Sequence, residues 1–198
     1  MKAFAGEFFE TIYKCLKQTE CAVTDDGLNF RSVTPEEGTE LFFDEVKKAA
    51  AQGNKVLYIG NGGSASIASH MSVDLWKNGK IKSLCFNDPS MLTCLGNDLG
   101  YENVFSAPTE SFADKGDVFV SISSSGKSPN IINASKTALK KGCSLVTFSG
   151  FSRENPLMKM GKINFYVPSN VYGIVETVHS ALCHAVVNCI IEAAERKQ

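Results

Sequence analysis

The stretch YIGNGGSASIASHMSVDLW, residues 58–76, joins three different kinds of sequence. A short apolar run ends at Gly60, a glycine-rich bend follows, and a pattern of helical spacing then carries His70 and Asp74 one turn apart. A buried strand followed by a tight bend and a helix is the repeating unit of a parallel α/β sheet. We therefore expect a strand over residues 55–60 and a helix over residues 64–77.

The same alternation of strand and helix continues to the end of the chain. The pattern predicts further strands over 82–86, 117–123, 143–149 and 163–168, and helices over 89–96, 128–141 and 172–195. Apolar strands that alternate with helices predict a parallel sheet covered on both faces, with ligands bound beyond the carboxyl ends of the strands. We found no repeat, linker or low-complexity segment, so we expect a single α/β domain over 1–198.

The N-terminal third reads as mainly helical. Apolar residues recur at helical spacing over residues 2–21, and a polar, turn-rich segment follows over 22–33. Thr34 followed by Pro35 is a capping residue with proline at the first helical position, which predicts a second helix that runs to about Gln52.

Composition excludes several classes of protein. A formal net charge of −1 gives no reason to expect a nucleic acid or a membrane surface as a partner. The longest apolar runs are shorter than the roughly 20 residues that span a bilayer, and acidic residues stand where a signal peptide would be apolar. The seven cysteines are scattered without a C-x-x-C pair, as expected for reduced, buried thiols. We expect a cytoplasmic protein.

The first loop that could hold a ligand is Gly60-Asn61-Gly62-Gly63-Ser64. Three glycines in four positions let the backbone turn sharply and bring its N–H groups close to an anion, with the Ser64 hydroxyl beside them. Neither the Gly-Lys-Ser/Thr of a P-loop nor the G-x-G-x-x-G of a dinucleotide site is present. A plain tight turn is an equally good interpretation of this loop taken alone.

The second loop, SSSGKS at residues 123–128, follows a predicted strand and precedes a predicted helix. Its hydroxyls, its backbone N–H groups and the positive end of the helix dipole would together suit a phosphate monoester. The alternative is a serine-rich turn that caps the helix. One cap needs only one serine, and the four present favour the anion site.

Ionisable residues on two helices form a possible metal or catalytic centre. His70 and Asp74 project about 40° apart on one helix face, which suits either two ligands of one metal or a surface hydrogen bond. On the last helix, Glu176 lies about 60° from His179 and about 80° from His184 around the axis, so spacing does not choose between the two histidines. An intersubunit salt bridge is the alternative to a pocket.

Four blocks in this chain together resemble the sugar isomerase (SIS) domain: GNGGSASIASH, GNDLGYENVFS, ISSSGKSPNIINA and VETVHSALCHAV. Within that family they are similar to the phosphoheptose isomerases, which convert sedoheptulose 7-phosphate to D-glycero-D-manno-heptose 7-phosphate. The resemblance implies a five-stranded parallel sheet flanked by helices in a flavodoxin-like three-layer sandwich over 54–198. It also implies N-terminal helices over 1–53 that help to build a homotetramer, with active sites at subunit interfaces.

The resemblance also assigns site residues, motif by motif. It implies that the substrate phosphate is held by Ser123, Ser124, Ser125 and Ser128, and that the sugar is bound by Asn61, Gly62, Ser64, Asn97 and Asp98. It implies one zinc ion held by His70, Asp74, Glu176 and His184, with Asp74, Glu176 and His184 as catalytic residues. His179 becomes a packing residue or a neighbour of the ligands.

Three positions depart from the family pattern: Asp74 replaces the usual glutamate, Glu176 the usual glutamine and Gly173 a frequent aspartate. A shorter carboxylate moves its oxygens by about one bond length, and a misplacement near 1 Å can cost about 100-fold in rate. Two carboxylates would also cancel the charge of a divalent zinc and weaken it as a Lewis acid. These changes fit either a retuned enzyme or a different sugar phosphate.

The function expected on this basis is a phosphosugar aldose–ketose isomerase of heptose biosynthesis. A metal would polarise the carbonyl, Asp74 or Glu176 would remove the adjacent proton to give an enediol, and His184 would handle the second proton transfer. One alternative is a non-catalytic SIS protein such as the relative that binds the replication initiator DnaA, which lacks the histidine corresponding to His184. Another is a regulatory domain that senses a sugar phosphate.

Overall fold

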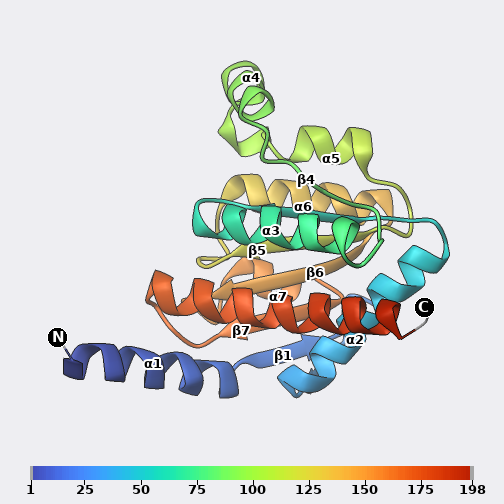
Figure 1. Cartoon of the computed structure of the whole chain (residues 1–198). Helices are drawn as coiled ribbons and strands as arrows, with labels where there is room; N and C mark the ends of the chain where they lie inside the picture. Colours follow the sequence, from blue (N-terminus) through green and yellow to red (C-terminus); the bar gives the residue numbers. More distant parts are fainter. Residues whose placement is uncertain (1, 197–198) are drawn as a thin grey trace.

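The computed structural model of the protein describes residues 2–196. A central sheet lies between two layers of helices, and the long helix α1 lies along one edge of the molecule (Figure 1). The elements are α1 Lys2–Lys17, β1 Glu20–Val23, β2 Arg31–Val33, α2 Pro35–Ala51, β3 Val56–Gly60, α3 Gly63–Lys77, β4 Ser83–Cys85, α4 Pro89–Leu99, η1 Tyr101–Asn103, α5 Ser106–Phe112, β5 Val118–Ser123, α6 Pro129–Lys141, β6 Ser144–Gly150, η2 Pro156–Lys159, β7 Ile163–Val167 and α7 Tyr172–Glu195.

The sheet has seven strands in the order β2-β1-β7-β6-β5-β3-β4. Its β7-β6-β5-β3-β4 part is parallel and contains the five strands expected from the sequence, so the α/β class is confirmed. The prediction of only five strands was wrong, because β1 and β2 add an antiparallel ribbon next to β7. Strands of four and three residues are too short to show a periodicity, and β1 is fixed by its pairing with the distant strand β7.

The first helix is also shorter than expected. It ends at Lys17 rather than at residue 21, since Cys21 and Val23 turn inward from β1 to join the core. The second helix begins as predicted: the Thr34 hydroxyl accepts a hydrogen bond from the Glu37 N–H at 3.1 Å, with Pro35 in the first turn.

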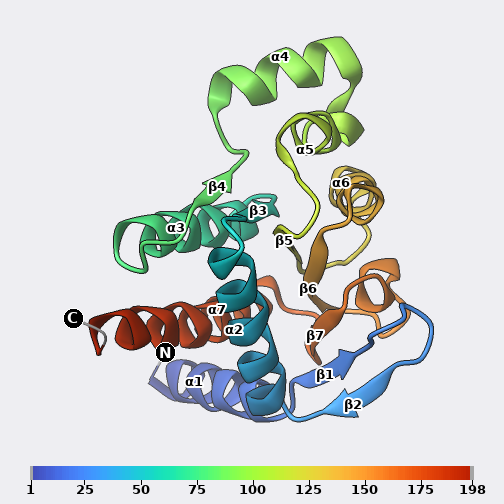
Figure 2. The same ribbon diagram turned by 90° about the vertical axis from the view of Figure 1, so that its right-hand side faces the viewer.

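Two hydrophobic clusters cover the two faces of the sheet. One joins α1, α2, α3 and α7 to the sheet, with Phe42, Tyr58 and Met71 among its fully buried side chains. The other lies beneath α5 and α6 and contains Phe105 and Phe119. Figure 2 shows α2, α3 and α7 on one side of the sheet and α5 and α6 on the other.

Helices α3 and α7 lie side by side and run in the same direction (Figure 1). Their register is fixed by two glycines, Gly63 at the start of α3 and Gly79 just beyond its end. A Cβ on Gly63 would lie 2.3 Å from the Glu176 carboxylate, and one on Gly79 would lie 3.1 Å from Ile190. This parallel pairing places the residues of the two helices that carry the candidate chemistry along a single seam.

Helix α4 projects from the body of the molecule (Figure 2). It runs three residues further than expected, to Leu99, and none of its residues is fully buried although many are apolar. Its Met91, Leu92 and Leu95 pack only partly against the core. This helix therefore has a face that its own chain does not cover.

Among the described residues, one segment, Tyr172–Ala194 of α7, is long and apolar enough to cross a membrane by length and composition alone. Half of its most apolar window is buried inside this protein, and the core helix of a globular protein passes the same test.

Candidate functional site

The glycine bend and the serine loop meet in one pocket of about 230 Å³. The two loops follow β3 and β5, which are neighbours in the sheet and run parallel, with Gly60 opposite Ile122 at their carboxyl ends. The pocket is lined by Asn61, Gly62, Ser64, Ser123, Ser124, Ser125, Ser128, Tyr172 and Glu176. Seven of these nine residues were predicted to bind the sugar phosphate, and we call this cavity the serine pocket.

Glycine is required where the first loop turns. Gly62 has φ +55° and ψ −123°, a conformation that L side chains rarely adopt. A Cβ on Gly60 would lie 2.5 Å from the backbone of Ser64. Asn61 and Asn130 then tie the two loops together: the Nδ2 of each donates to the Oδ1 of the other, at 3.0 and 2.9 Å. The pocket is thus built before a ligand arrives.

The serine hydroxyls are only partly used within the chain. Ser123 and Ser125 accept hydrogen bonds from the N–H groups of Gly126 and Lys127, at 3.2 and 3.3 Å. The Ser124 hydroxyl is buried and has no partner among residues 2–196. Ser128 stands at the N-cap of α6, yet its side chain makes no capping bond within the described chain. These free hydroxyls support an anion site rather than a simple helix cap.

A second group of candidate residues lies further along the seam between α3 and α7. The His70 Nε2 lies 3.3 Å from the Asp74 Oδ2. The ring of His184 meets the ring of His70 edge-on, with centroids 5.1 Å apart. These three side chains, which we call the histidine cluster, lie close together; the spacing had left His179 and His184 open, and the resemblance had assigned His184.

Glu176 lies apart from the histidine cluster. Its carboxylate packs against Gly63 at the beginning of α3 and lines the serine pocket. Glu176 and His184 are eight positions apart, which corresponds to about 12 Å along the helix. Within the described part of the chain, no three His, Cys, Asp or Glu side chains are arranged to hold a metal ion. The four predicted ligands therefore do not form one site in this arrangement, although two imidazoles and a carboxylate are donors that zinc prefers.

His179 has a structural place in the core. It is fully buried, and its Nε2 donates to the backbone oxygen of Ser149 at 3.0 Å. Burial lowers the pKa of His179 to about 4, so the ring is neutral at pH 7. It also packs edge-on against Phe148. His179 thus lies away from the seam, and of the two histidines it is His184 that joins the cluster.

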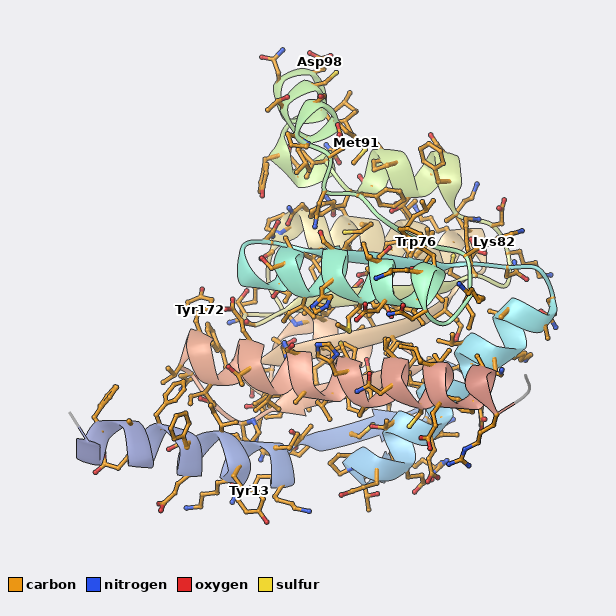
Figure 3. All side chains as sticks on the ribbon, in the orientation of Figure 1. Tyr13, Trp76, Lys82, Met91, Asp98 and Tyr172 are labelled. Atoms are coloured by element: carbon orange, nitrogen blue, oxygen red, sulfur yellow. The ribbon has the colours of Figure 1, made fainter. Side chains whose placement is uncertain are left out.

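Asn97 and Asp98 lie at the far end of α4, outside the serine pocket of their own chain. Figure 3 shows Asp98 at the tip of this projecting helix. The Asn97 Nδ2 donates to the Asp98 Oδ1 at 2.8 Å, and both side chains are exposed. Their predicted role in sugar binding stays a prediction.

The sequence analysis missed two residues of the site and a neighbouring cavity. Neither Tyr172 nor Asn130 was singled out by its motif; the fold brings Tyr172 to the wall of the serine pocket and Asn130 behind that wall, where it is hydrogen-bonded to Asn61. A second cavity of about 400 Å³ shares Asn61 and Gly62 with the serine pocket and is also lined by Asn87 and Tyr101. The Tyr101 hydroxyl donates to the Asn61 Oδ1 at 3.1 Å. Asn61, which lines both cavities, is therefore hydrogen-bonded to Tyr101 as well as to Asn130.

The serine pocket lies at the carboxyl edge of a parallel sheet, where open α/β domains bind ligands, and comparison with known proteins identifies the class of domain. Residues 34–150 match the SIS domain. The chain belongs to the SIS domain family.

Its relatives within the family are named consistently. The chain is 35% identical to the phosphoheptose isomerase of Maridesulfovibrio salexigens over 84% of this chain and 87% of that one. It is 38% identical to that of Aliarcobacter butzleri over 70% of this chain and 76% of the other. The solved structure of phosphoheptose isomerase GmhA from Neisseria gonorrhoeae superposes with a TM-score of 0.80 at 27% identity, covering 96% of this chain and 98% of that one.

Proposed function

We propose that the protein is a phosphosugar aldose–ketose isomerase that converts sedoheptulose 7-phosphate to D-glycero-D-manno-heptose 7-phosphate. The observation that carries this proposal is the serine pocket, where the buried Ser124 hydroxyl, without a partner among residues 2–196, joins three other serines at a helix N-terminus. A phosphate monoester supplies the acceptors that these donors lack. The choice of sedoheptulose 7-phosphate as the substrate rests on the relatives that are named phosphoheptose isomerase.

The spacing of the site supports a seven-carbon substrate. Gly63 at the serine pocket and His70 in the histidine cluster are seven residues apart on α3, or about 10 Å along the helix. An extended chain gains about 1.2 Å per bond, so six carbon–carbon bonds plus the phosphate ester also span roughly 10 Å. With the phosphate on the serines, C1 and C2 would lie beside His70, Asp74 and His184. Each carbon removed from the substrate shortens this reach by about 1 Å.

The chemistry requires one proton to move from C1 to C2 and another from O1 to O2. Asp74, held by His70, is the carboxylate nearest to the expected position of C1, and we assign to it the removal of that proton and its return to C2 of the enediol. His184 lies against His70 and would carry the proton between the two oxygens. Glu176 lies at the phosphate end, where the ring oxygen of the closed sugar would be, and would exchange a proton with it during ring opening.

A divalent metal, with zinc as the predicted ion, is part of the proposal. His70, Asp74 and His184 carry the donors that would hold it, but their side chains would first have to converge, since no three such side chains among the described residues are arranged around a metal position; when bound, the ion would make the C1–H bond more acidic by polarising the carbonyl. Glu176 is not placed to share it in the described arrangement. The chain's own residues account for phosphate binding and for the positions of the proton carriers.

We further propose a cytoplasmic homotetramer with active sites at subunit interfaces. The uncovered face of α4 and the distance of Asn97 and Asp98 from their own pocket support this arrangement. In it, α4 would carry these two residues to the site of another protomer, and residues 1–53 would contribute to the assembly. Mixing two inactive variants, Asp98→Ala and Ser124→Ala, tests this: about a quarter of the shared sites should regain both residues and activity.

The direct test of function is a time course with purified protein and sedoheptulose 7-phosphate, followed by NMR with and without added zinc. Appearance of an aldoheptose phosphate in the wild type, and its absence in His184→Ala, is the expected result. No turnover by a folded protein that binds the sugar phosphate would refute the assignment. It would favour an isomerase for another sugar phosphate or a non-catalytic SIS protein.

A further inference from the structure

Tyr172 is a large aromatic residue that the hydrophobic core does not use. It is the first residue of α7, its side chain is 61% exposed, and it lines the serine pocket together with Glu176 and the serines. Figure 3 shows it at the N-terminal end of α7, the end at which α3 also begins. An exposed aromatic ring at the rim of a polar pocket adds apolar surface that the phosphate itself does not need.

The ring of Tyr172 is supported by Phe151. The two rings meet edge to face, with centroids 4.8 Å apart and planes at 78°. Such pairs hold their partners in a defined orientation. Phe151 follows β6 directly and has φ +58°, in the left-handed region, which is unfavourable for a bulky residue.

Two hydrogen bonds hold Phe151 in this conformation. Its N–H donates to the backbone oxygen of Ser169 at 3.0 Å, and its carbonyl oxygen accepts from the Tyr166 hydroxyl at 2.9 Å. Both partners belong to β7 or to the segment that leads from β7 to α7. A strained conformation that its surroundings enforce is typical of a functional site. Phe151 is thus held in a strained backbone conformation in which its ring packs against the exposed ring of Tyr172.

The serine loop is connected to the same unit. A Cβ on Gly150 would lie 2.9 Å from Val175 and 3.2 Å from the backbone oxygen of Ser124. The end of β6, the serine loop and the first turn of α7 are therefore in close contact. Tyr172 cannot drift relative to the serines without moving Phe151 and this packed backbone.

We propose that Tyr172 is a sugar-binding residue of the serine pocket and that Phe151 positions it. The ring of Tyr172 covers the C–H face of the substrate carbons next to the phosphate, while the serines hold the phosphate. This inference rests on the proposed function, because it takes a phosphosugar as the ligand. It separates two parts of recognition: the serines select a phosphate, and the aromatic pair selects the sugar attached to it.

The test compares a phosphosugar with inorganic phosphate. Steady-state kinetics with sedoheptulose 7-phosphate give KM and kcat, and competition by inorganic phosphate gives an inhibition constant for the phosphate cradle alone. Tyr172→Ala should raise KM about tenfold, with kcat and the inhibition constant for phosphate within twofold of the wild type. Tyr172→Phe separates the ring from its hydroxyl and should retain most of the affinity.

Phe151→Leu keeps an apolar side chain and removes the aromatic support, so KM should rise by a smaller factor, about threefold. The matched control is Val171→Ala, next to Tyr172, because Val171 is 57% exposed and does not line the serine pocket. It should leave KM unchanged. If Phe151→Leu fails to fold, the exposed Tyr172 still carries the test, since its replacement removes no core contact.

An unchanged KM in Tyr172→Ala would overturn the proposal. An equal loss of affinity for sugar phosphate and inorganic phosphate would overturn it too, because Tyr172 would then belong to the phosphate cradle. If the wild type showed no turnover, the proposed function would fail. Calorimetric titration with the two ligands would then decide the role of Tyr172 by the same comparison.

Discussion

Replacing Gly63 with alanine should lower the catalytic rate without lowering the stability of the fold. Gly63 begins α3, and a Cβ at this position would lie 2.3 Å from the Glu176 Oε2 and 2.7 Å from its Oε1. An ordinary contact begins near 3.4 Å, so the tip of the Glu176 side chain has to move by at least about 1 Å. A misplacement of about 1 Å in an active site costs on the order of 100-fold in rate.

The backbone should tolerate the change. Gly63 does not have a positive φ, and alanine favours a helix over glycine by roughly 1 kcal/mol in a helix interior. The atoms that must move belong to the end of a flexible side chain. We therefore expect Gly63→Ala to unfold at the wild-type temperature or slightly above it, with kcat/KM reduced about 100-fold.

The assay combines thermal unfolding with the NMR time course on sedoheptulose 7-phosphate. Gly6→Ala is the matched control, because Gly6 lies in α1 and has no atom within 4 Å of an added Cβ. It should leave kcat/KM unchanged. If Gly63→Ala keeps wild-type kcat/KM while Glu176→Gln loses it, the contact between Gly63 and Glu176 does not position the carboxylate, and the reasoning is wrong.

Three further predictions follow from other parts of the site. Ser124→Ala removes a buried hydroxyl that has no partner among the described residues, so the unfolding free energy should stay the same or rise by about 1 kcal/mol. Affinity for the sugar phosphate, measured by calorimetry, should fall at least tenfold. A lower unfolding free energy would contradict this prediction. In equilibrium dialysis, Glu176→Gln should retain bound zinc and His184→Ala should lose it, since Glu176 lies apart from the histidine cluster. Loss of zinc in both variants would instead support a site in which Glu176 is also a ligand. Burial lowers the pKa of His179 from 6.5 to about 4, so between these pH values the folded state binds fewer protons than the unfolded state. The neutral, buried ring therefore contributes about 3 kcal/mol to the unfolding free energy above pH 6.5, and this contribution is lost as pH falls towards 4. Urea unfolding from pH 7 to pH 4.5 measures this, and an equal fall in His179→Phe would refute the assignment to His179.

Local sequence was sufficient for the parallel part of the fold. The apolar runs that became β3, β5, β6 and β7 are buried along their whole length except at Ser144, so their composition distinguishes them from the helices. The glycine bend and the serine loop were likewise visible as sequence, because a positive φ and a cluster of hydroxyls depend on residue type. Their meeting in one pocket followed from the parallel order of the strands.

Other features depended on contacts between distant residues. The strand β1 exists because Cys21 pairs opposite Phe165, and no periodicity in four residues could reveal that. The separation of Glu176 from His70 and Asp74 follows from the register of α3 against α7, where Gly63 and Gly79 leave no room for a side chain, whereas its separation from His184 follows from their spacing on α7. Motif matching placed these four residues in one set, since a motif records identity and order but not distance.

The sequence by itself determined the α/β class, the glycine bend, the serine loop and the ionisable residues of the two helices, because each depends on local composition and spacing. Only the tertiary structure decided which of these residues meet. It placed His184 beside His70, as the resemblance but not the spacing had indicated, placed Glu176 at the serine pocket, and brought Tyr172 and Phe151 together at the rim of that pocket. Helix packing fixes such distances, and it depends on side chains more than a hundred residues apart in the chain.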